Sequence, residues 1–360
     1  MSEQKPFRLV IAGGGTGGHV IPALAIAREM KEKHSAEVLF IGTSRGIETR
    51  LVPQAGFKLE LVEIGALNQT SLWRAVETLL QLPVAVYSAA KVLHKFRADV
   101  VLGVGGYASG PAMIAAILQG CPTMVFEPNL QPGFANRMVA GFVRAAAVHF
   151  EGTKKHFKNA RVTGVPVRKE FFALPVIGAA QGKTLLVTGG SQGAHAINET
   201  MCKAIRELEA EVKGLMVVHQ TGQKDCDEVR RVYAEAGVQA EVSAFLDDMP
   251  SAFARADVVL CRSGASTCAE LAASGCVSVF VPFPFATDDH QTRNAQAFVE
   301  RGAAEMILQK ELTEEKLVST LAPLLNDDTR RAKMSDAARG LAHPNATAEI
   351  AQMILELGKR

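Results

Sequence analysis

The sequence is poor in the features that mark disulfide-rich, zinc-binding or membrane-spanning proteins. Its six cysteines form no CxxC pair and no Cys/His cluster at the spacing of a zinc site. No run reaches the roughly 18 apolar residues of a membrane-spanning helix, and the N-terminus lacks the basic and apolar segments of a secretory signal. The sequence therefore predicts a cytosolic chain with reduced, mostly buried cysteines.

Net charge is also small over the whole chain, at +2, but the two halves differ. Residues 1–168 carry 19 Lys and Arg against 11 Asp and Glu, whereas residues 169–360 carry 20 against 26. A basic N-terminal half favours an anionic substrate or an anionic membrane surface, and scattered surface lysines are the alternative. We expect no nucleic-acid partner.

What the sequence does contain is a repeated pattern of strands and helices. With 360 residues, of which 48% are apolar, the chain can bury two hydrophobic cores. Short runs rich in Val, Ile and Leu alternate with segments of helical periodicity, which predicts βαβ units and parallel sheets. The first half contains predicted strands at Arg8–Ala12, Val38–Ile41, Leu59–Val62, Val100–Val104, Thr123–Phe126 and Ala146–Val148. After a Gly-, Ala- and Pro-rich stretch, the second half contains predicted strands at Thr184–Thr188, Met216–Gln220, Glu241–Ala244, Val258–Cys261 and Ser278–Val281.

Each half opens with a strand that leads into a glycine-rich loop and then a helix. The two segments read LVIAGGGTGGH and LLVTGGSQGAH, and they form a degenerate repeat of two nucleotide-type folds. Backbone amides in such a loop, at the N-terminus of a helix, attract an anion such as a pyrophosphate. Two loops therefore indicate two anionic ligands, and a tight turn without a ligand is the alternative for each.

The first loop also has the glycine spacing of a dinucleotide-binding motif. The acidic residue that this motif needs roughly 20 residues later is absent, because the second strand ends at Gly42-Thr43. The GKT segment at 182–184 is not a P-loop, since it precedes its strand. These two observations disfavour a dehydrogenase and a P-loop enzyme.

Six short motifs follow one another along the chain in the order of a known family. They are Gly14-Gly15-Thr16-Gly17-Gly18-His19, Gly103-Val104-Gly105-Gly106-Tyr107, Glu127 with Asn129, Gly164-Val165-Pro166-Val167-Arg168, Gly189-Gly190-Ser191-Gln192-Gly193-Ala194 and Arg262-Ser263-Gly264-Ala265. Over essentially its whole length the chain therefore closely resembles the MurG family. These bacterial enzymes move N-acetylglucosamine from UDP-GlcNAc to lipid I, forming lipid II for peptidoglycan synthesis.

The resemblance implies an α/β fold with two Rossmann-like parallel-sheet domains facing across a cleft, the GT-B glycosyltransferase fold. Residues 1–168 would hold the acceptor lipid I and face the membrane, and residues 169–342 would hold the donor UDP-GlcNAc. Residues 343–360 would form a C-terminal helix, predicted to be amphipathic, that returns to the N-terminal domain. UDP-GlcNAc is a substrate, so no cofactor is expected.

The same resemblance predicts where the chain works. Its partners would be UDP-GlcNAc, lipid I and the anionic inner leaflet, at the cytoplasmic face of the bacterial plasma membrane. The stretch Leu72–Phe96 interleaves apolar residues with Arg and Lys, which suits an anionic leaflet, and core-facing helices are the alternative. A related enzyme with another acceptor, a UDP-sugar 2-epimerase and a non-catalytic nucleotide-sugar-binding protein remain alternatives for the function.

On the donor side, Ala265, Ser266 and Thr267 open a helix directly after a predicted strand, so their amides would meet the diphosphate together with Ser191. The adjacent pairs Asp247-Asp248 and Asp288-Asp289 lack the D-x-D spacing of metal-dependent transferases, and they fit solvated loop acids instead. No metal is therefore expected. The helix dipole and cations such as Arg168 would then stabilise the charge that develops on the leaving UDP.

Three further residues would bind the rest of the donor. By similarity to the family, Glu270 would accept hydrogen bonds from the ribose hydroxyls, Leu246 would contact the uracil through its backbone, and Gln291 would bind the sugar hydroxyls. Glu270 also fits a capping box that begins at Thr267. Gln291 also fits the cap of a helix at Gln291–Val299.

On the acceptor side, Thr16, Gly17 and Gly18 would bind the diphosphate of lipid I. A base must also take the proton of the MurNAc C4 hydroxyl as this oxygen attacks the anomeric carbon from the face opposite UDP, which inverts the configuration. His19 is the first candidate, because an imidazole ordinarily titrates near pH ~6.5, and Glu127 is the competitor. A phosphate-binding or loop-closing role is the alternative for His19.

One motif departs from the family. MurG proteins usually read His-Glu-Gln-Asn where this chain has Phe126-Glu127-Pro128-Asn129, so one imidazole and one amide are lost. Roles of those two side chains cannot be transferred to this chain. Asn129 remains and would contact the donor sugar.

Overall fold

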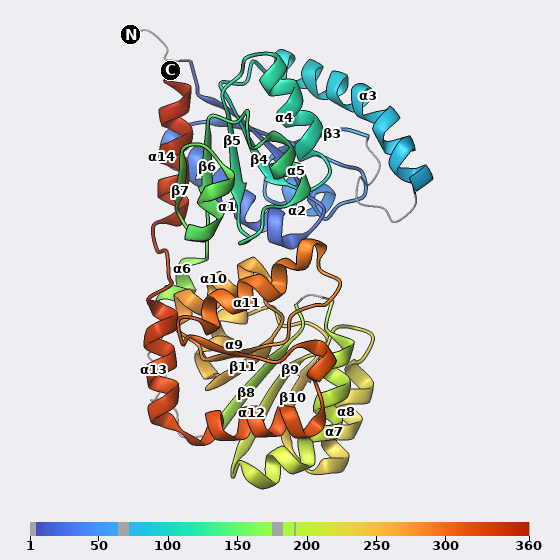
Figure 1. Cartoon of the computed structure of the whole chain (residues 1–360), viewed down its shortest axis with the longest axis vertical. Helices are drawn as coiled ribbons and strands as arrows, with labels where there is room; N and C mark the ends of the chain where they lie inside the picture. The colour runs from blue at the N-terminus through green and yellow to red at the C-terminus, as the bar shows by residue number, and fades with distance from the viewer. Residues whose placement is uncertain (1–4, 64–71, 175–182, 191, 360) are drawn as a thin grey trace. The chain divides into compact units, whose positions relative to one another are not determined.

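In a computed structural model, which describes residues 5–63, 72–174, 183–190 and 192–359, the chain divides into two compact units. Unit 1 comprises Met1–Pro166 together with Asn345–Arg360, and unit 2 comprises Val167–Pro344 (Figure 1). The chain therefore passes from unit 1 to unit 2 and returns to unit 1 for its last helix. The expected boundary between residues 168 and 169 lies two residues beyond the observed one.

Unit 1 is built on a seven-stranded sheet in which every strand pair is parallel. Across the sheet the strands are β3 (Lys58–Leu61), β2 (Glu37–Gly42), β1 (Arg8–Gly13), β4 (Val100–Gly105), β5 (Thr123–Glu127), β6 (Ala145–Val148) and β7 (Ala160–Val162). Strands β4 and β5 are buried along their whole length. Continuous apolar runs are typical of such strands, because helices cover both faces of a parallel sheet.

The helices of unit 1 are α1 (Gly17–His34), α2 (Glu48–Gln54), α3 (Leu72–Phe96), α4 (Ser109–Leu118), α5 (Phe134–Val139), the 3₁₀ helix η1 (Glu151–His156) and α14 (Ala346–Gly358). Helices α3, α4 and α5 contribute side chains to one apolar cluster with the strands. The C-terminal helix α14 packs against α1 and also contacts β4 and β6. It buries its apolar stripe, including Ile350, Ile354 and Leu357, in unit 1.

Unit 2 repeats the plan with a six-stranded parallel sheet. Across the sheet the strands are β10 (Gln239–Ser243), β9 (Leu215–Gln220), β8 (Lys183–Thr188), β11 (Val258–Cys261), β12 (Ser278–Phe280) and β13 (Ala304–Met306). Its helices are α6 (Lys169–Phe172), α7 (His195–Glu211), α8 (Cys226–Ala236), α9 (Met249–Arg255), α10 (Ala265–Ser274), η2 (Thr287–Asp289), α11 (His290–Val299), η3 (Gln309–Glu311), α12 (Glu314–Asn326) and α13 (Asp328–Arg339). The predicted class, two Rossmann-like parallel-sheet domains, is confirmed.

In both sheets the first strand lies in the interior, and the strand order reverses beside it. Strand β1 lies between β2 and β4, and β8 lies between β9 and β11. A crevice forms at such a reversal, outside the carboxyl ends of the strands, and it is where open α/β sheets bind ligands. Both glycine-rich loops begin at these two strands, so the topology places each loop at the expected binding position of its own unit.

Candidate functional site

The first glycine loop, between β1 and α1, lies against the end of β4. A Cβ on Gly13, which has a φ of 143°, would lie 2.2 Å from the carbonyl oxygen of Gly105. A Cβ on Gly106, which has a φ of 82°, would lie 2.3 Å from the carbonyl oxygen of Gly14. The two glycine motifs are therefore needed together, because their backbones approach too closely for side chains.

The side chain of Glu48 is buried and holds this loop through hydrogen bonds. Its Oε2 accepts a 2.7 Å hydrogen bond from the Gly15 amide, and its Oε1 accepts from the amide and the hydroxyl of Thr43, at 3.0 and 3.1 Å. Only 1% of Glu48 is exposed. The Gly15 amide is thus engaged within the chain, and the loop amides suited to an external anion are those of Thr16–Gly18, at the start of α1.

His19 is the third residue of α1 and is partly buried. Its Nδ1 lies 3.2 Å from the carbonyl oxygen of Gly14 and 3.4 Å from Oγ1 of Thr16. Because a carbonyl oxygen only accepts hydrogen bonds, Nδ1 carries the proton in the contact with Gly14, and in the neutral imidazole the lone pair is then on Nε2. A Cβ on Gly105 would lie 3.0 Å from Nε2, so that atom lies over the end of β4. The fixed tautomer suits a general base.

Glu127 ends β5 and is 1% exposed. Its Oε1 accepts from the backbone and side-chain amides of Asn129, and its Oε2 accepts from the Gly133 amide and the Asn136 side chain, all within 3.2 Å. Burial raises the pKa of Glu127, although these four donors oppose the rise. With both oxygens engaged, Glu127 is suited to holding this loop, and Asn129 in it, more than to abstracting a proton. The neighbouring Phe126 is fully buried in the core.

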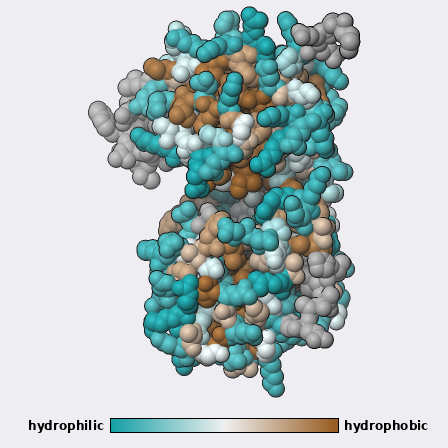
Figure 2. All heavy atoms as spheres, turned by 180° about the vertical axis from the view of Figure 1, so that it is seen from behind, coloured by the Kyte–Doolittle hydropathy of each residue, from teal (hydrophilic) through white to brown (hydrophobic). Residues whose placement is uncertain are grey.

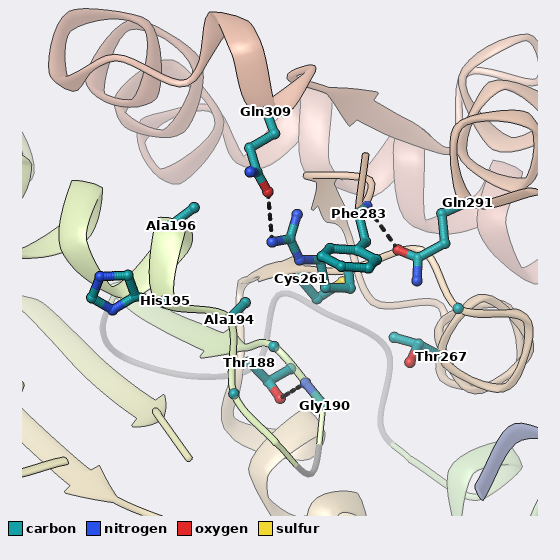
Figure 3. A pocket seen from close by; sticks show the side chains of 14 residues that line it. Thr188, Gly190, Ala194, His195, Ala196, Cys261, Thr267, Phe283, Gln291 and Gln309 are labelled. Atoms are coloured by element: carbon teal, nitrogen blue, oxygen red, sulfur yellow. Dashed lines mark hydrogen bonds between the residues drawn. The ribbon is translucent and has the colours of Figure 1, made fainter. Parts of the chain in front are cut away.

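Unit 2 contains a cavity of about 580 Å³ at the second glycine loop. It is lined by Thr188, Gly189, Gly190, Gly193, Ala194, His195, Ala196, Cys261, Arg262, Gly264, Thr267, Phe283, Gln291 and Gln309. Figure 3 shows residues from the end of β8, the start of α7 and the loops after β11, β12 and β13 converging on it. Ser191 lies outside the described residues.

The first turn of α10 contributes another wall of this cavity. Gly264 is the N-cap residue, and Ala265, Ser266 and Thr267 are the first three helical residues. Thr267 lines the cavity, whereas Oγ of Ser266 is buried without a hydrogen-bond partner in the described part of the chain. Glu270 is the sixth helical residue, so the capping-box alternative is wrong, because such a box needs its acid at the third.

Glu270 is partly buried, and burial raises the pKa of its carboxyl to about 7, while the charge of Arg168 opposes the rise. Arg168 is itself exposed at the N-cap of α6, and its guanidinium lies 5.2 Å from the Phe171 ring centre. A carboxyl with a pKa near neutral is a frequent property of functional sites, and Glu270 follows Thr267, which lines the cavity, by three residues in α10.

Arg262 is partly buried and carries its charge into the lining of the cavity. Its guanidinium donates to the carbonyl oxygens of Val281 and Pro282, at 2.9 and 3.0 Å, and to Oε1 of Gln309, at 2.7 Å. It lies 5.4 Å from the Phe283 ring centre, and burial lowers its pKa to about 10. Among the described residues these partners are all neutral. A desolvated cation without a carboxylate leaves the cavity positive, which suits an anionic ligand.

Leu246 and Gln291 are held by hydrogen bonds near the same loop. The Leu246 amide donates to Oε1 of Gln220, whose Nε2 donates to the Gly190 carbonyl, so a uracil contact would use the Leu246 carbonyl oxygen. Oε1 of Gln291 accepts from the Phe283 amide, at 3.0 Å. Gln291 is the second residue of α11 and not its cap, so the capping alternative is wrong.

The paired acids are solvated, and two of them, Asp288 and Asp289, lie in η2. Asp247, Asp248, Asp288 and Asp289 are all exposed, and Asp248 caps α9 by accepting from the Ser251 amide. Within the described ranges, no three His, Cys, Asp or Glu side chains are arranged to hold a metal ion.

Sequence analysis missed Glu48, and it did not assign Arg262 a role of its own. The signal for Arg262 was its place directly after a buried strand, in a motif that was recognised as a unit. No local pattern marks Glu48, because its hydrogen bonds to the amides of Gly15 and Thr43 form only when the chain is folded.

Comparisons with known proteins agree with this arrangement. The N-terminal domain of glycosyltransferase family 28 matches residues 9–148, and the C-terminal domain of the same family matches residues 184–352. A transferase of Myxococcus xanthus is 43% identical over 98% of this chain and 93% of its own length, and one of Solibacter usitatus is 42% identical over 97% and 96%. Both carry the name UDP-N-acetylglucosamine–N-acetylmuramyl-(pentapeptide) pyrophosphoryl-undecaprenol N-acetylglucosamine transferase.

Solved structures show the same fold. MurG of Acinetobacter baumannii superposes with a TM-score of 0.84, at 31% identity, covering 98% of this chain and 100% of that one. The UDP-GlcNAc 2-epimerase of Neisseria meningitidis, bound to UDP-GlcNAc, superposes with a TM-score of 0.68 over 98% of this chain and 100% of its own. At 16% identity the second likeness shows the fold alone.

Proposed function

Because the chain belongs to glycosyltransferase family 28, we infer that it transfers N-acetylglucosamine from UDP-GlcNAc to the undecaprenyl-pyrophosphoryl-MurNAc-pentapeptide known as lipid I. The product is lipid II, the precursor of peptidoglycan. The observation that carries this inference is the 43% identity to a transferase of that name over 98% of the chain. The positive cavity in unit 2, built around Arg262, supports an anionic donor.

Unit 2 is proposed to bind the donor. The diphosphate would meet the amides at the start of α10, with the charges of Arg262 and Arg168 nearby, and Glu270 would accept from the ribose hydroxyls. When the bond between the anomeric carbon and the phosphate oxygen breaks, these groups would stabilise the negative charge on UDP. The leaving group then needs no metal ion.

Unit 1 is proposed to bind the acceptor. The amides of Thr16–Gly18 would hold the lipid I diphosphate, and Nε2 of His19 would take the proton of the C4 hydroxyl. The C4 oxygen would form the new bond to the anomeric carbon on the face opposite UDP, so the configuration inverts. The hydrogen bond from His19 Nδ1 to the Gly14 carbonyl supports this assignment, because in the neutral imidazole it places the lone pair on Nε2.

We also propose that unit 1 binds the membrane peripherally. No helix in the described ranges combines the length and apolar character of a membrane span. Four large apolar side chains, Val84, Tyr87, Leu118 and Phe142, are 62–76% exposed on or beside α3, α4 and α5. Lys91 lies 4.4 Å from the Tyr87 ring centre, and Figure 2 shows apolar side chains gathered on one face of this unit. Side chains of residues 72–80, which the membrane hypothesis also included, lie outside the description. An anionic cytoplasmic leaflet fits this mixture.

The function is tested by measuring UDP release from UDP-GlcNAc in the presence and absence of a lipid I analogue. We expect release to require both substrates, and to be much slower with UDP-GalNAc. Release or epimerisation of UDP-GlcNAc without the lipid would instead favour hydrolase or 2-epimerase activity. Tight UDP-GlcNAc binding without turnover would favour a non-catalytic binding protein.

A further inference from the structure

His195 is a polar side chain in the unit 2 cavity to which the proposed function gives no role. It is the first residue of α7, directly after the second glycine loop, and it lines the cavity. Its side chain is 71% exposed, and its Nδ1 lies 3.0 Å from Oδ2 of Asp225. Figure 3 shows the imidazole beside Ala194 and Ala196, at one end of the cavity.

A chain of buried hydrogen bonds fixes Asp225 as an acceptor. The Asn198 amide nitrogen donates to the Thr221 carbonyl and to Oδ2 of Asp225, both at 2.8 Å, so Oδ1 of Asn198 must accept. That oxygen accepts from Nε2 of His219, at 3.0 Å, whose Nδ1 then accepts from the Tyr233 hydroxyl, at 2.9 Å. The position of each proton in this series of hydrogen bonds is therefore fixed by the neighbouring groups.

The protonation states follow from this network. Burial lowers the pKa of His219 to about 3, so its imidazole is neutral. Burial alone would raise the pKa of Asp225, but hydrogen bonds from Asn198 and His195 hold it below the ordinary range. Asp225 is thus a carboxylate that only accepts, and Nδ1 of His195 must donate to it. The atom of His195 that remains for a ligand is Nε2.

The charges around His195 are mostly acidic. Asp225 faces it from α8, and Glu199 lies one turn along α7 and pairs with Lys203, at 2.9 Å. The charge of Lys224 contributes to lowering the pKa of Asp225. The other helix packed on α7 is α12, and the charge of its Glu314 contributes to raising the pKa of Lys203. With His195 neutral, Asp225 leaves a negative charge next to His195, at the edge of the cavity, and this charge repels a phosphate. With His195 protonated, that charge is neutralised and Nε2–H becomes a donor.

We propose that His195 binds the diphosphate of the donor as an imidazolium held by Asp225, so that UDP-GlcNAc binding is coupled to the uptake of a proton. This inference rests on the proposed function of the cavity. The coupling is reciprocal: protonation strengthens diphosphate binding, and the bound diphosphate stabilises the protonated imidazole. An N–H donor to phosphate is a charge-assisted hydrogen bond, which is stronger than a neutral one.

The test is calorimetric titration of the full chain with UDP-GlcNAc from pH 6 to 8.5, in buffers of different ionisation enthalpy. His195→Gln should weaken binding about tenfold at pH 6, should match the wild type at pH 8.5, and should lose the proton uptake. His195→Arg, a permanent cation, should bind tightly at every pH. His94→Gln, at an exposed position in unit 1, is the matched control and should behave as the wild type.

The wild type and its variants are compared at the same pH, because the pKa of Glu270, about 7, lies in the same range. Deprotonation of Glu270 at high pH would favour donor binding, whereas for His195 it is protonation at low pH that favours it. Equal affinity and equal proton uptake of His195→Gln and wild type at pH 6 would overturn the role of His195 while leaving the proposed function intact. Failure of the wild type itself to bind UDP-GlcNAc would overturn both.

Discussion

Glu270, which is proposed to bind the donor ribose, lowers the stability of the fold at high pH. Its pKa is about 7 in the folded chain against an ordinary value of 4.5, so folding favours the protonated form. The corresponding stability is complete below pH 4.5 and is lost as the pH rises through 7. Glu270→Gln should therefore raise the unfolding free energy at pH 8 by on the order of 2 kcal/mol, and leave it nearly unchanged at pH 4.5.

The same substitution should raise KM for UDP-GlcNAc about tenfold, because the amide is a weaker acceptor for the ribose hydroxyls than the carboxylate. Urea unfolding at the two pH values and steady-state kinetics check both effects. An unchanged KM would remove Glu270 from the donor site, whatever the stability shows.

His19 is predicted to act in the chemical step. His19→Ala should lower kcat by about 10²- to 10⁴-fold with little change in KM for UDP-GlcNAc, because the donor is assigned to the other unit. Single-turnover kinetics with saturating lipid acceptor measure this, with His34→Gln, at the end of α1, as the control. A kcat close to that of the wild type would show that another group is the base.

At the scale of residues, the sequence could predict which side chains have a functional role, but not which groups they hydrogen-bond. The order of the motifs placed Glu270 and Gln291 on the donor side. A capping role for these two residues could be excluded only from the structure, in which the N-cap residues of their helices are Gly264 and Asp289. The hydrogen bonds that join Glu48 to Gly15, Arg262 to Gln309 and His195 to Asp225 each link residues 30 or more positions apart, and local sequence pattern carries no information about them.

The glycine loops make a prediction at the scale of elements. A Cβ on Gly193 would lie 1.8 Å from the Thr221 carbonyl oxygen, whereas a Cβ on Gly190 would meet nothing within 4 Å. Both have positive φ, at 74° and 81°, so they share the conformational strain but not the clash. Gly193→Ala should displace the loop and weaken UDP-GlcNAc binding at least tenfold, and Gly190→Ala should cost only about 1 kcal/mol of stability.

Calorimetric binding and thermal unfolding of the two variants separate these effects. Equal UDP-GlcNAc affinity in both variants would mean that the shape of the second loop does not matter for the donor.

Among the elements, the strands with continuous apolar runs could be predicted, whereas the two edge strands β7 and β13 could not. Ala160–Val162 and Ala304–Met306 are three residues long and contain a charged residue each, so they lack both length and pattern. Each becomes a strand because it pairs with the free edge of its neighbour in the sheet, β6 for the first and β12 for the second. The interior strands β1, β4, β8 and β11, which position the two loops, were all predicted, and that is why the loops could be located.

For the whole molecule, the membrane proposal predicts salt-sensitive attachment. Binding to vesicles of anionic phospholipid should weaken as ionic strength rises, and Lys91→Glu should weaken it at least fivefold at low salt, since a basic residue near the surface contributes about 1 kcal/mol. Tyr87→Ser should also weaken it. Phe285→Ser is the control, because this phenylalanine is 81% exposed but lies in unit 2. Equal loss in the control, or binding indifferent to salt, would argue against the surface.

The central claim is that this molecule joins N-acetylglucosamine to the C4 hydroxyl of MurNAc in lipid I with inversion. The most direct measurement is mass and NMR analysis of the product formed from UDP-GlcNAc and lipid I. We expect one added N-acetylglucosamine per lipid, β-linked to the C4 oxygen, with one UDP released for each. An α-linkage, or UDP and altered sugar formed while the lipid stays unmodified, would contradict the account.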